Sequence, residues 1–145
     1  MSGKQKTDLK DLNAFLRKNK NINFRTADLL HTAKIEQYNW KGLTAKKEQL
    51  VKQLKAYQRM LRVVPNDRED LAKALLKQGF QSALQITNTP RKAFIQKNLK
   101  LFDNDRTLAE QVYKRALVLR KAVALQYVAR VQQAEPHARA VGFVR

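Results

Sequence analysis

Apolar residues recur at steps of three and four through most of the chain, the spacing that places side chains on one face of an α-helix. Only four Gly and three Pro occur among the 145 residues, so long helices can run without interruption. No segment alternates at the period of a strand, and no internal repeat is visible. The sequence therefore predicts an all-α protein, a single compact bundle of six or seven helices. The clearest amphipathic stripe, in the segment 44–64, carries Leu50, Leu54, Tyr57, Leu61 and Val64.

Capping residues and helix breakers predict where the helices begin and end. After a first helix over about 9–16, a second helix is expected to carry Leu29, Leu30, Ala33 and Ile35. The predicted stops are the polar run 18–21, Pro65, Gly79 and the cluster 103–105. The predicted N-terminal caps are Thr26, Asn66 paired with Glu69, Ser82, Thr89 followed by Pro90, and Thr107 paired with Glu110, and the helix with the clearest stripe is expected to begin at Thr44.

The last predicted helix is the longest, and it ends before Pro136. Its apolar surface is wide, which favours a helix at the centre of the bundle that is contacted from more than one side. We expect one domain over 1–145, in which 1–7 and 137–145 are flexible tails. The first apolar row is Leu108, Val112, Ala116, Leu119, Val123, Tyr127 and Val131, and the second is Tyr113, Leu117, Ala124 and Val128.

Positive charge dominates the chain, with 30 Lys plus Arg against 12 Asp plus Glu and a formal net charge of +18. Such a surplus attracts nucleic acid, an anionic membrane surface or an acidic wall inside a larger assembly. On the segment 44–64, the face opposite the apolar stripe carries a basic stripe of Lys52, Lys55, Arg59 and Arg62. A docking surface and a solvated helix face are both open interpretations of this basic stripe.

The segment 71–95 resembles the helix-hairpin-helix units that grip phosphate backbones, because a helix, a tight turn at Gly79 and further short helices follow one another. Those hairpins place two glycines around an apolar residue, whereas Gly79, Phe80 and Gln81 supply only the first glycine. The segment is thus either a pseudo helix-hairpin-helix or a helical corner that fills the core. Arg91 and Lys92 lie in the first turn of the helix after it, where free N–H groups favour an anion.

Residues suited to catalysis or metal binding are scarce. The chain has no Cys and only two His, which are His31 and His137. The cluster 103–105 lacks the glycine and terminal glutamate of a calcium loop, and no glycine-rich phosphate loop occurs. We therefore predict a protein that is not an enzyme and has no catalytic residue, metal site or cofactor. His31 is expected to be a surface or half-buried side chain.

Three runs carry a family resemblance: LKAYQRMLRVVPN, DLAKALLKQGFQSALQITNTPRKAFIQ and AEQVYKRALVLRKAVAL. Together with FLRKNKNINFRTADL upstream, they resemble a helical module near the N-terminal part of very large bacterial toxin-complex A proteins and their neuraminidase-like relatives. The resemblance covers roughly 15–127 and consists of patterned apolar positions rather than a catalytic motif. It implies a helical region of a giant pore-forming or translocating assembly, without enzymatic activity of its own.

The function predicted from the sequence is a non-enzymatic structural and interaction module that docks in a larger toxin or injection-type assembly. The alternative is a nucleic-acid-binding protein that uses the pseudo helix-hairpin-helix, Arg91, Lys92 and the basic stripe. A membrane-surface binder is a third reading, which suits the charge but lacks the bulky exposed apolar face of interfacial helices. The predicted partner is a protein, and nucleic acid or another polyanion and a second copy remain open. No signal peptide or transmembrane segment is visible, so a bacterial protein that is cytoplasmic, or exported within an assembly, is expected.

Overall fold

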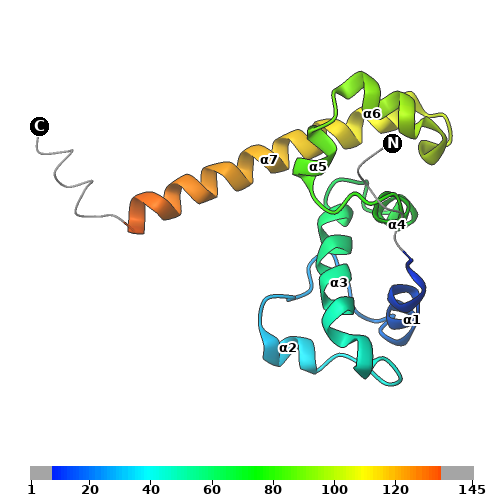
Figure 1. The fold of residues 1–145 in the computed structure, drawn as a ribbon, viewed down its shortest axis with the longest axis vertical. Helices are drawn as coiled ribbons and strands as arrows, with labels where there is room; N and C mark the ends of the chain where they lie inside the picture. The colour runs from blue at the N-terminus through cyan, green and yellow to red at the C-terminus, as the bar shows by residue number, and fades with distance from the viewer. Residues whose placement is uncertain (1–7, 135–145) are drawn as a thin grey trace, which may run out of the picture.

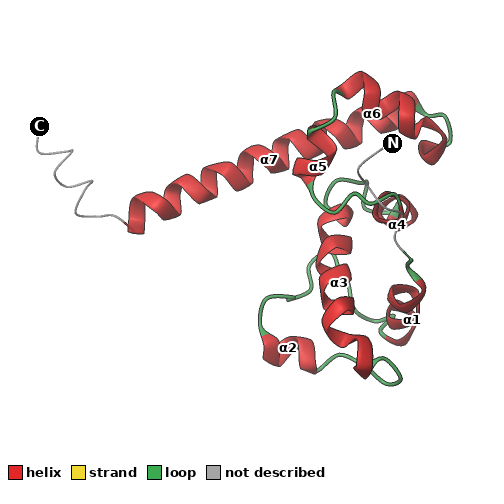
Figure 2. Ribbon diagram, in the orientation of Figure 1, coloured by secondary structure: helices red, strands yellow, loops and turns green. Residues whose placement is uncertain are grey.

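The helical spacing of the sequence is realised in a computed structural model that describes residues 8–134 (Figure 1). Seven α-helices and two short 3-10 helices make up this part of the chain, and it contains no strand (Figure 2). The all-α class and the long C-terminal helix are therefore confirmed, whereas the predicted tails lie outside the described residues. The elements are α1 (Lys10–Lys18), α2 (Thr32–Glu36), η1 (Thr44–Lys46), α3 (Lys47–Leu61), α4 (Glu69–Lys77), α5 (Ala83–Thr87), α6 (Arg91–Asn98), η2 (Leu99–Phe102) and α7 (Arg106–Ala134).

The N-terminal half is organised around α3, which packs against both α1 and α4. Phe15 of α1 is fully buried and lies 4.6 Å from Trp40 and 5.7 Å from Phe24, measured between ring centroids. The buried Asn19 joins the end of α1 to the segment after α2, because its side-chain oxygen accepts a hydrogen bond from the backbone N–H of Asn39 at 2.9 Å. Aromatic packing and one buried amide thus hold the loop-rich segment 20–43 against the body.

The C-terminal half is built on the first part of α7, against which α5, α6 and η2 all pack. Phe94 of α6 lies at the centre of a second aromatic cluster and is fully buried. Its ring centroid is 5.5 Å from those of Phe80 and Tyr113 and 6.1 Å from that of Phe102. Contacts of α4 with α3 and η2 join the two halves into one hydrophobic core.

Two of the predicted helix ends have the expected geometry. Gly79 takes a positive φ of 98° after α4, and its N–H donates to the carbonyl oxygen of Leu76 while the Phe80 N–H donates to that of Leu75. This pair of bonds is the Schellman motif that glycine favours. The Ser82 hydroxyl caps α5, because it accepts a hydrogen bond from the Gln85 N–H at 3.2 Å.

The two later predicted caps are wrong by one or two residues. Pro90, not Thr89, is the N-cap of α6, which begins at Arg91. The helix α7 begins before Thr107, because the Asp105 side chain accepts a hydrogen bond from the Leu108 N–H at 3.1 Å and its carbonyl accepts one from Ala109. The Asp105 carboxylate, two residues earlier, is therefore the N-terminal cap that we expected the Thr107 hydroxyl to be.

The two earlier predicted caps are also wrong. Thr26 does not begin a helix, because the Asp28 side chain accepts hydrogen bonds from the N–H groups of Leu30 and His31 and keeps this segment in turns. The helix α2 starts only at Thr32, and Leu30 is 86% exposed instead of buried. Asn66 does not cap α4 either, since that helix begins three residues later, at Glu69, with no side-chain cap.

The expectation that the longest helix is surrounded by the bundle is wrong for half of its length. The helix α7 has 29 residues, about 44 Å. Its first half packs against the body, and Figure 1 shows the remainder running out past the other helices. Every residue from 121 to 131 is exposed. The predicted stop at Pro136 lies outside the described residues.

Candidate functional site

The basic stripe predicted from the sequence lies on the outer face of α3 and just beyond its end. Lys52, Arg59 and Arg62 are exposed, and Lys55 is half-buried. Arg59 has a structural partner, because its Nε atom donates a hydrogen bond to the carbonyl oxygen of Gln81 at 2.7 Å. Desolvation and then the neighbouring Arg62 charge lower the pKa of Arg59. One of the four cations thus joins α3 to the turn before α5.

The turn after α4 does not offer free N–H groups to a phosphate. The N–H groups of Gly79 and Phe80 are used in the Schellman motif, and the Gln81 N–H donates to the side-chain oxygen of Gln85. Phe80 is also buried in the core. The segment 71–95 therefore has the geometry of a core-filling corner.

Arg91 and Lys92 are exposed at the start of α6. This helix packs against α7 and η2, whereas the basic stripe belongs to α3, which packs against α1 and α4 (Figure 1). The two groups of predicted site residues therefore belong to different parts of the molecule. The structure does not gather the six cations into a single site.

The most unusual surface of the described chain is the distal half of α7, defined here as residues 118–131. Leu125 is 70% exposed and Tyr127 is 67% exposed, and no other described element presents so many large apolar side chains to solvent. A contiguous exposed apolar surface on a folded protein marks an interaction site. The large apolar residues exposed here are Val118, Val123, Leu125, Tyr127, Val128 and Val131.

Apolar residues occur on every side of this distal half. Val118, Ala122, Leu125 and Ala129 are spaced by four, three and four residues and share one side of the helix. Two other sides carry the continuations of the rows predicted from the sequence, namely 123, 127 and 131, and 124 and 128. A helix that is apolar all round is normally buried on several sides.

The charges of the distal half are all positive. Arg120, Lys121 and Arg130 project from different sides of the helix, and no Asp or Glu occurs from 111 to 134. A partner that covers this segment must therefore provide apolar contacts together with carboxylates.

Hydrogen bonds fix the proximal part of α7 to the body and so determine the direction in which the distal half extends. The Tyr113 hydroxyl donates to the carbonyl oxygen of Thr89 at 2.7 Å, and an Arg115 nitrogen donates to that of Val64 at 3.4 Å. Close to the point of departure, Arg120 donates to the Thr87 hydroxyl oxygen at 3.3 Å. The distal half is thus the free end of an anchored helix.

Within residues 8–134, no group of three or more His, Asp or Glu side chains could hold a metal ion. His31 lies on the surface, and its Nδ1 atom is 2.7 Å from the Asp28 carboxylate. This contact, followed by the backbone N–H groups of His31 and Leu30, lowers the pKa of Asp28 to about 2. The pair organises the turn before α2. Among the described helices, none is both long and apolar enough to cross a membrane.

In comparisons with known proteins, no protein-family model, no curated protein and no solved structure matches the chain. The resemblance to toxin-complex A proteins therefore stays a prediction.

Proposed function

We propose that the protein is a non-enzymatic helical docking module that joins a larger assembly by burying the distal half of α7 among the helices of a partner protein. The observation that carries the proposal is that every residue from 121 to 131 is exposed, on a helix that is apolar on all sides. Burying a large apolar side chain stabilises a complex by about 1.5–3 kcal/mol, so six such side chains can drive association.

The chemistry of the proposed partner follows from the charge of α7. Because the segment 111–134 has no acidic residue, a second copy would bring cation against cation. A partner with an apolar groove and acidic residues along its rim would match both properties. The toxin or injection-type assembly implied by the family resemblance is the setting that we propose for this partner.

A membrane surface fits the distal half less well. Interfacial helices separate their charged residues from their apolar residues, so that one face can enter the lipid. Here Arg120, Lys121 and Arg130 lie on different sides, and each would have to be accommodated among apolar neighbours. The helices of a protein partner, in contrast, can place a carboxylate beside each of these cations.

Photocrosslinking tests the proposal directly. A photoreactive amino acid at Leu125 of the full chain, expressed in cells of its source, should give one dominant adduct with an acidic, helical protein. The same amino acid at Gln96, an exposed position on α6, is the matched control and should give none. The double substitution Val123→Gln with Tyr127→Gln should remove the adduct. Equal labelling from both positions would contradict the proposal.

The mass of the adduct separates the remaining outcomes. An adduct of twice the chain mass would identify a second copy as the partner, and crosslinking to lipid would identify a membrane surface. Light scattering of the purified chain should show a monomer at moderate salt. A stable dimer that the double substitution dissociates would replace the proposed heteromeric contact with self-association.

Nucleic-acid binding is the second candidate, favoured by the net charge of +18 and by the exposed cations Lys52, Arg62, Arg91 and Lys92. The occupied N–H groups of the turn after α4 weigh against a hairpin grip. An electrophoretic mobility assay at low salt distinguishes this candidate, because phosphate contacts release counterions and lose affinity steeply as salt increases. Absence of a mobility shift at low salt would eliminate it.

A further inference from the structure

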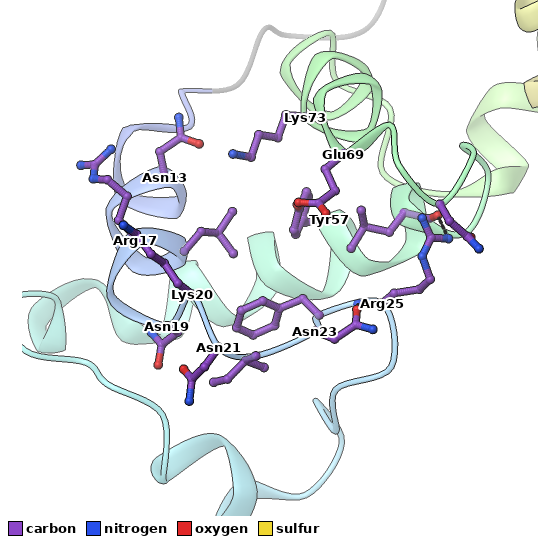
Figure 3. Close-up of a pocket in the computed structure, with 15 residues that line it drawn as sticks. Asn13, Arg17, Asn19, Lys20, Asn21, Asn23, Arg25, Tyr57, Glu69 and Lys73 are labelled. Carbon is purple, nitrogen blue, oxygen red and sulfur yellow. Dashed lines mark hydrogen bonds between the residues drawn. The ribbon is translucent and has the colours of Figure 1, made fainter.

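A cleft of about 710 Å³ lies on the N-terminal half, between α1, the loop 19–25, α3 and α4 (Figure 3). Its volume is in the range of clefts that hold small ligands. Leu16, Phe24 and Leu61 contribute apolar surface, and polar side chains border them. Neither the basic stripe nor α7 contributes a residue, so this cleft is separate from the surfaces considered above.

Cations outnumber carboxylates around the cleft by four to one: Arg17, Lys20, Arg25 and Lys73 face a single acid, Glu69. Arg25 is used within the fold, because its guanidinium donates to the carbonyl oxygens of Leu61 and Pro65 at the end of α3. In residues 8–134 the other three cations make no ion pair, so the cleft has an unmatched positive charge.

Tyr57 supplies an independent observation, because it is a buried polar side chain without a partner. It is only 3% exposed, and its hydroxyl has no hydrogen bond to any described residue. Every side-chain nitrogen or oxygen that is fully shielded from solvent in this part of the chain has a hydrogen-bond partner. The unpaired Tyr57 hydroxyl must therefore reach the open space of the cleft, where a ligand can accept a hydrogen bond from it.

The environment keeps this hydroxyl protonated. Burial and the nearby Glu69 charge raise the pKa of Tyr57 to about 12, although Arg25 opposes them. At neutral pH the phenol is therefore a hydrogen-bond donor.

Of the three cations without an ion pair, Lys73 is the one on α4, the helix that also carries Glu69 beside Tyr57. It is half-buried on α4, and Figure 3 shows its side chain extending across the cleft toward Asn13, with Glu69 above Tyr57. Glu69 is four residues before Lys73, a spacing that permits a pair, yet the two are not ion-paired. Lys73 also borders a smaller hollow with Asp8 and Asp70, and Asp70 is already paired with Arg68.

We propose that this cleft binds a ligand with an anionic oxygen group on an apolar body, held by the Lys73 ammonium group and the Tyr57 hydroxyl. The anionic oxygens would accept hydrogen bonds from both groups, and the apolar body would lie against Leu16, Phe24 and Leu61. A carboxylate and a phosphate share this chemistry. The Asn13 and Asn66 amides on the rim can donate and accept further hydrogen bonds.

A nuclear magnetic resonance titration of the ¹⁵N-labelled full chain tests the proposal. Hexanoate and hexyl phosphate are the two anionic probes, and hexanamide is the neutral probe of similar shape. One or both anions should give saturable shifts around Asn13, Tyr57 and Lys73, and the tighter of the two identifies the preferred group. Equal binding of hexanamide would reduce the site to an apolar cleft and overturn the proposal. Shifts that never saturate and spread over the basic surface would overturn it too.

Matched variants locate the binding groups. Lys73→Gln should weaken the tighter anion about tenfold, and Tyr57→Phe should weaken it by a similar factor, because each removes a hydrogen bond to a charged group. Lys77→Gln, which removes the same charge one turn later on α4 and outside the cleft, should leave the affinity unchanged. Tyr57→Phe removes a hydroxyl without a partner, so the melting temperature should not change. Undiminished binding by both cleft variants would contradict the assignment of Lys73 and Tyr57 as the binding groups.

Discussion

The hydroxyl of Tyr113 on α7 donates a hydrogen bond to the backbone carbonyl oxygen of Thr89 at 2.7 Å. Thr89 lies in the turn between α5 and α6, and the Tyr113 ring also packs against Phe94 of α6. One side chain therefore fixes the long helix to both of the short helices that precede it. Beyond this region α7 depends on few contacts, which is why its distal half extends free of the body.

Tyr113→Phe should lower the free energy of unfolding by about 1 kcal/mol, because it removes this bond and leaves the Thr89 carbonyl without the donor. Chemical denaturation of the two proteins measures the difference. Tyr127→Phe is the control, since Tyr127 is exposed on the distal half and should tolerate the change without loss. Equal effects of both substitutions would contradict the anchoring role of Tyr113.

Leu75→Ala and Leu125→Ala should separate the buried core from the exposed helix. Leu75 on α4 is fully buried, so its truncation should cost about 2–5 kcal/mol. Leu125 is 70% exposed, and its truncation should change the stability of the monomer by no more than about 0.5 kcal/mol. Thermal unfolding at low protein concentration is the measurement. A large loss from Leu125→Ala would mean that the distal half is already covered in the isolated chain.

Helix positions were predictable from the sequence wherever apolar spacing and one dominant capping residue agreed. Gly79 and Ser82 are such cases, because a positive φ and a hydroxyl cap are local properties. Thr26 fails because a neighbouring carboxylate, Asp28, accepts hydrogen bonds from the N–H groups of Leu30 and His31 and holds the segment in a turn. At Thr107, the Asp105 side chain instead caps the helix two residues earlier, through the Leu108 N–H. Where two polar side chains within two or three residues can cap, apolar spacing alone does not choose between them.

The exposure of the distal half of α7 could have been predicted from helix lengths. The longest of the other helices, α3, has 15 residues and spans about 22 Å, roughly half the length of α7. No expected neighbour was therefore long enough to cover all of α7. The cleft beside Tyr57 could not have been predicted, because its residues come from α1, a loop, α3 and α4, and only the tertiary fold brings them together.

Stability at acid pH should depend on Asp28. The pKa of its carboxyl group is lowered from 3.8 to about 2 in the folded chain, chiefly by the hydrogen bond with His31. A lowered pKa means that the contribution of this carboxylate is present above pH 3.8 and is lost as the pH falls toward about 2. Melting temperatures over this range should fall more steeply for the wild type than for Asp28→Asn. Parallel curves would contradict the expectation.

Stability at alkaline pH should depend on Tyr57, whose pKa is raised in the folded chain whereas that of Asp28 is lowered. The pKa of its hydroxyl is raised from 10.0 to about 12, so the unfolded chain releases this proton first and the folded state loses stability as the pH rises between these values. Tyr57→Phe lacks this dependence and should lose less stability than the wild type over the same range. In the wild type, near-ultraviolet absorbance of the phenolate should show a titration step near pH 12 that Tyr57→Phe lacks. Its absence would refute the burial of the hydroxyl.

Substitutions in the basic stripe should lower stability by different amounts, because only Arg59 has a structural partner within the described part of the chain. Arg59→Gln should cost about 1 kcal/mol, because it removes the hydrogen bond to the Gln81 carbonyl, whereas Lys52→Gln should stay within about 0.5 kcal/mol. Reversing all four charges would therefore mix a loss of stability with a loss of binding. Reversing Lys52, Lys55 and Arg62 to Glu while keeping Arg59 isolates the surface charge. If this triple variant keeps its helicity and binds an anionic partner as tightly as the wild type, the stripe is a solvated helix face.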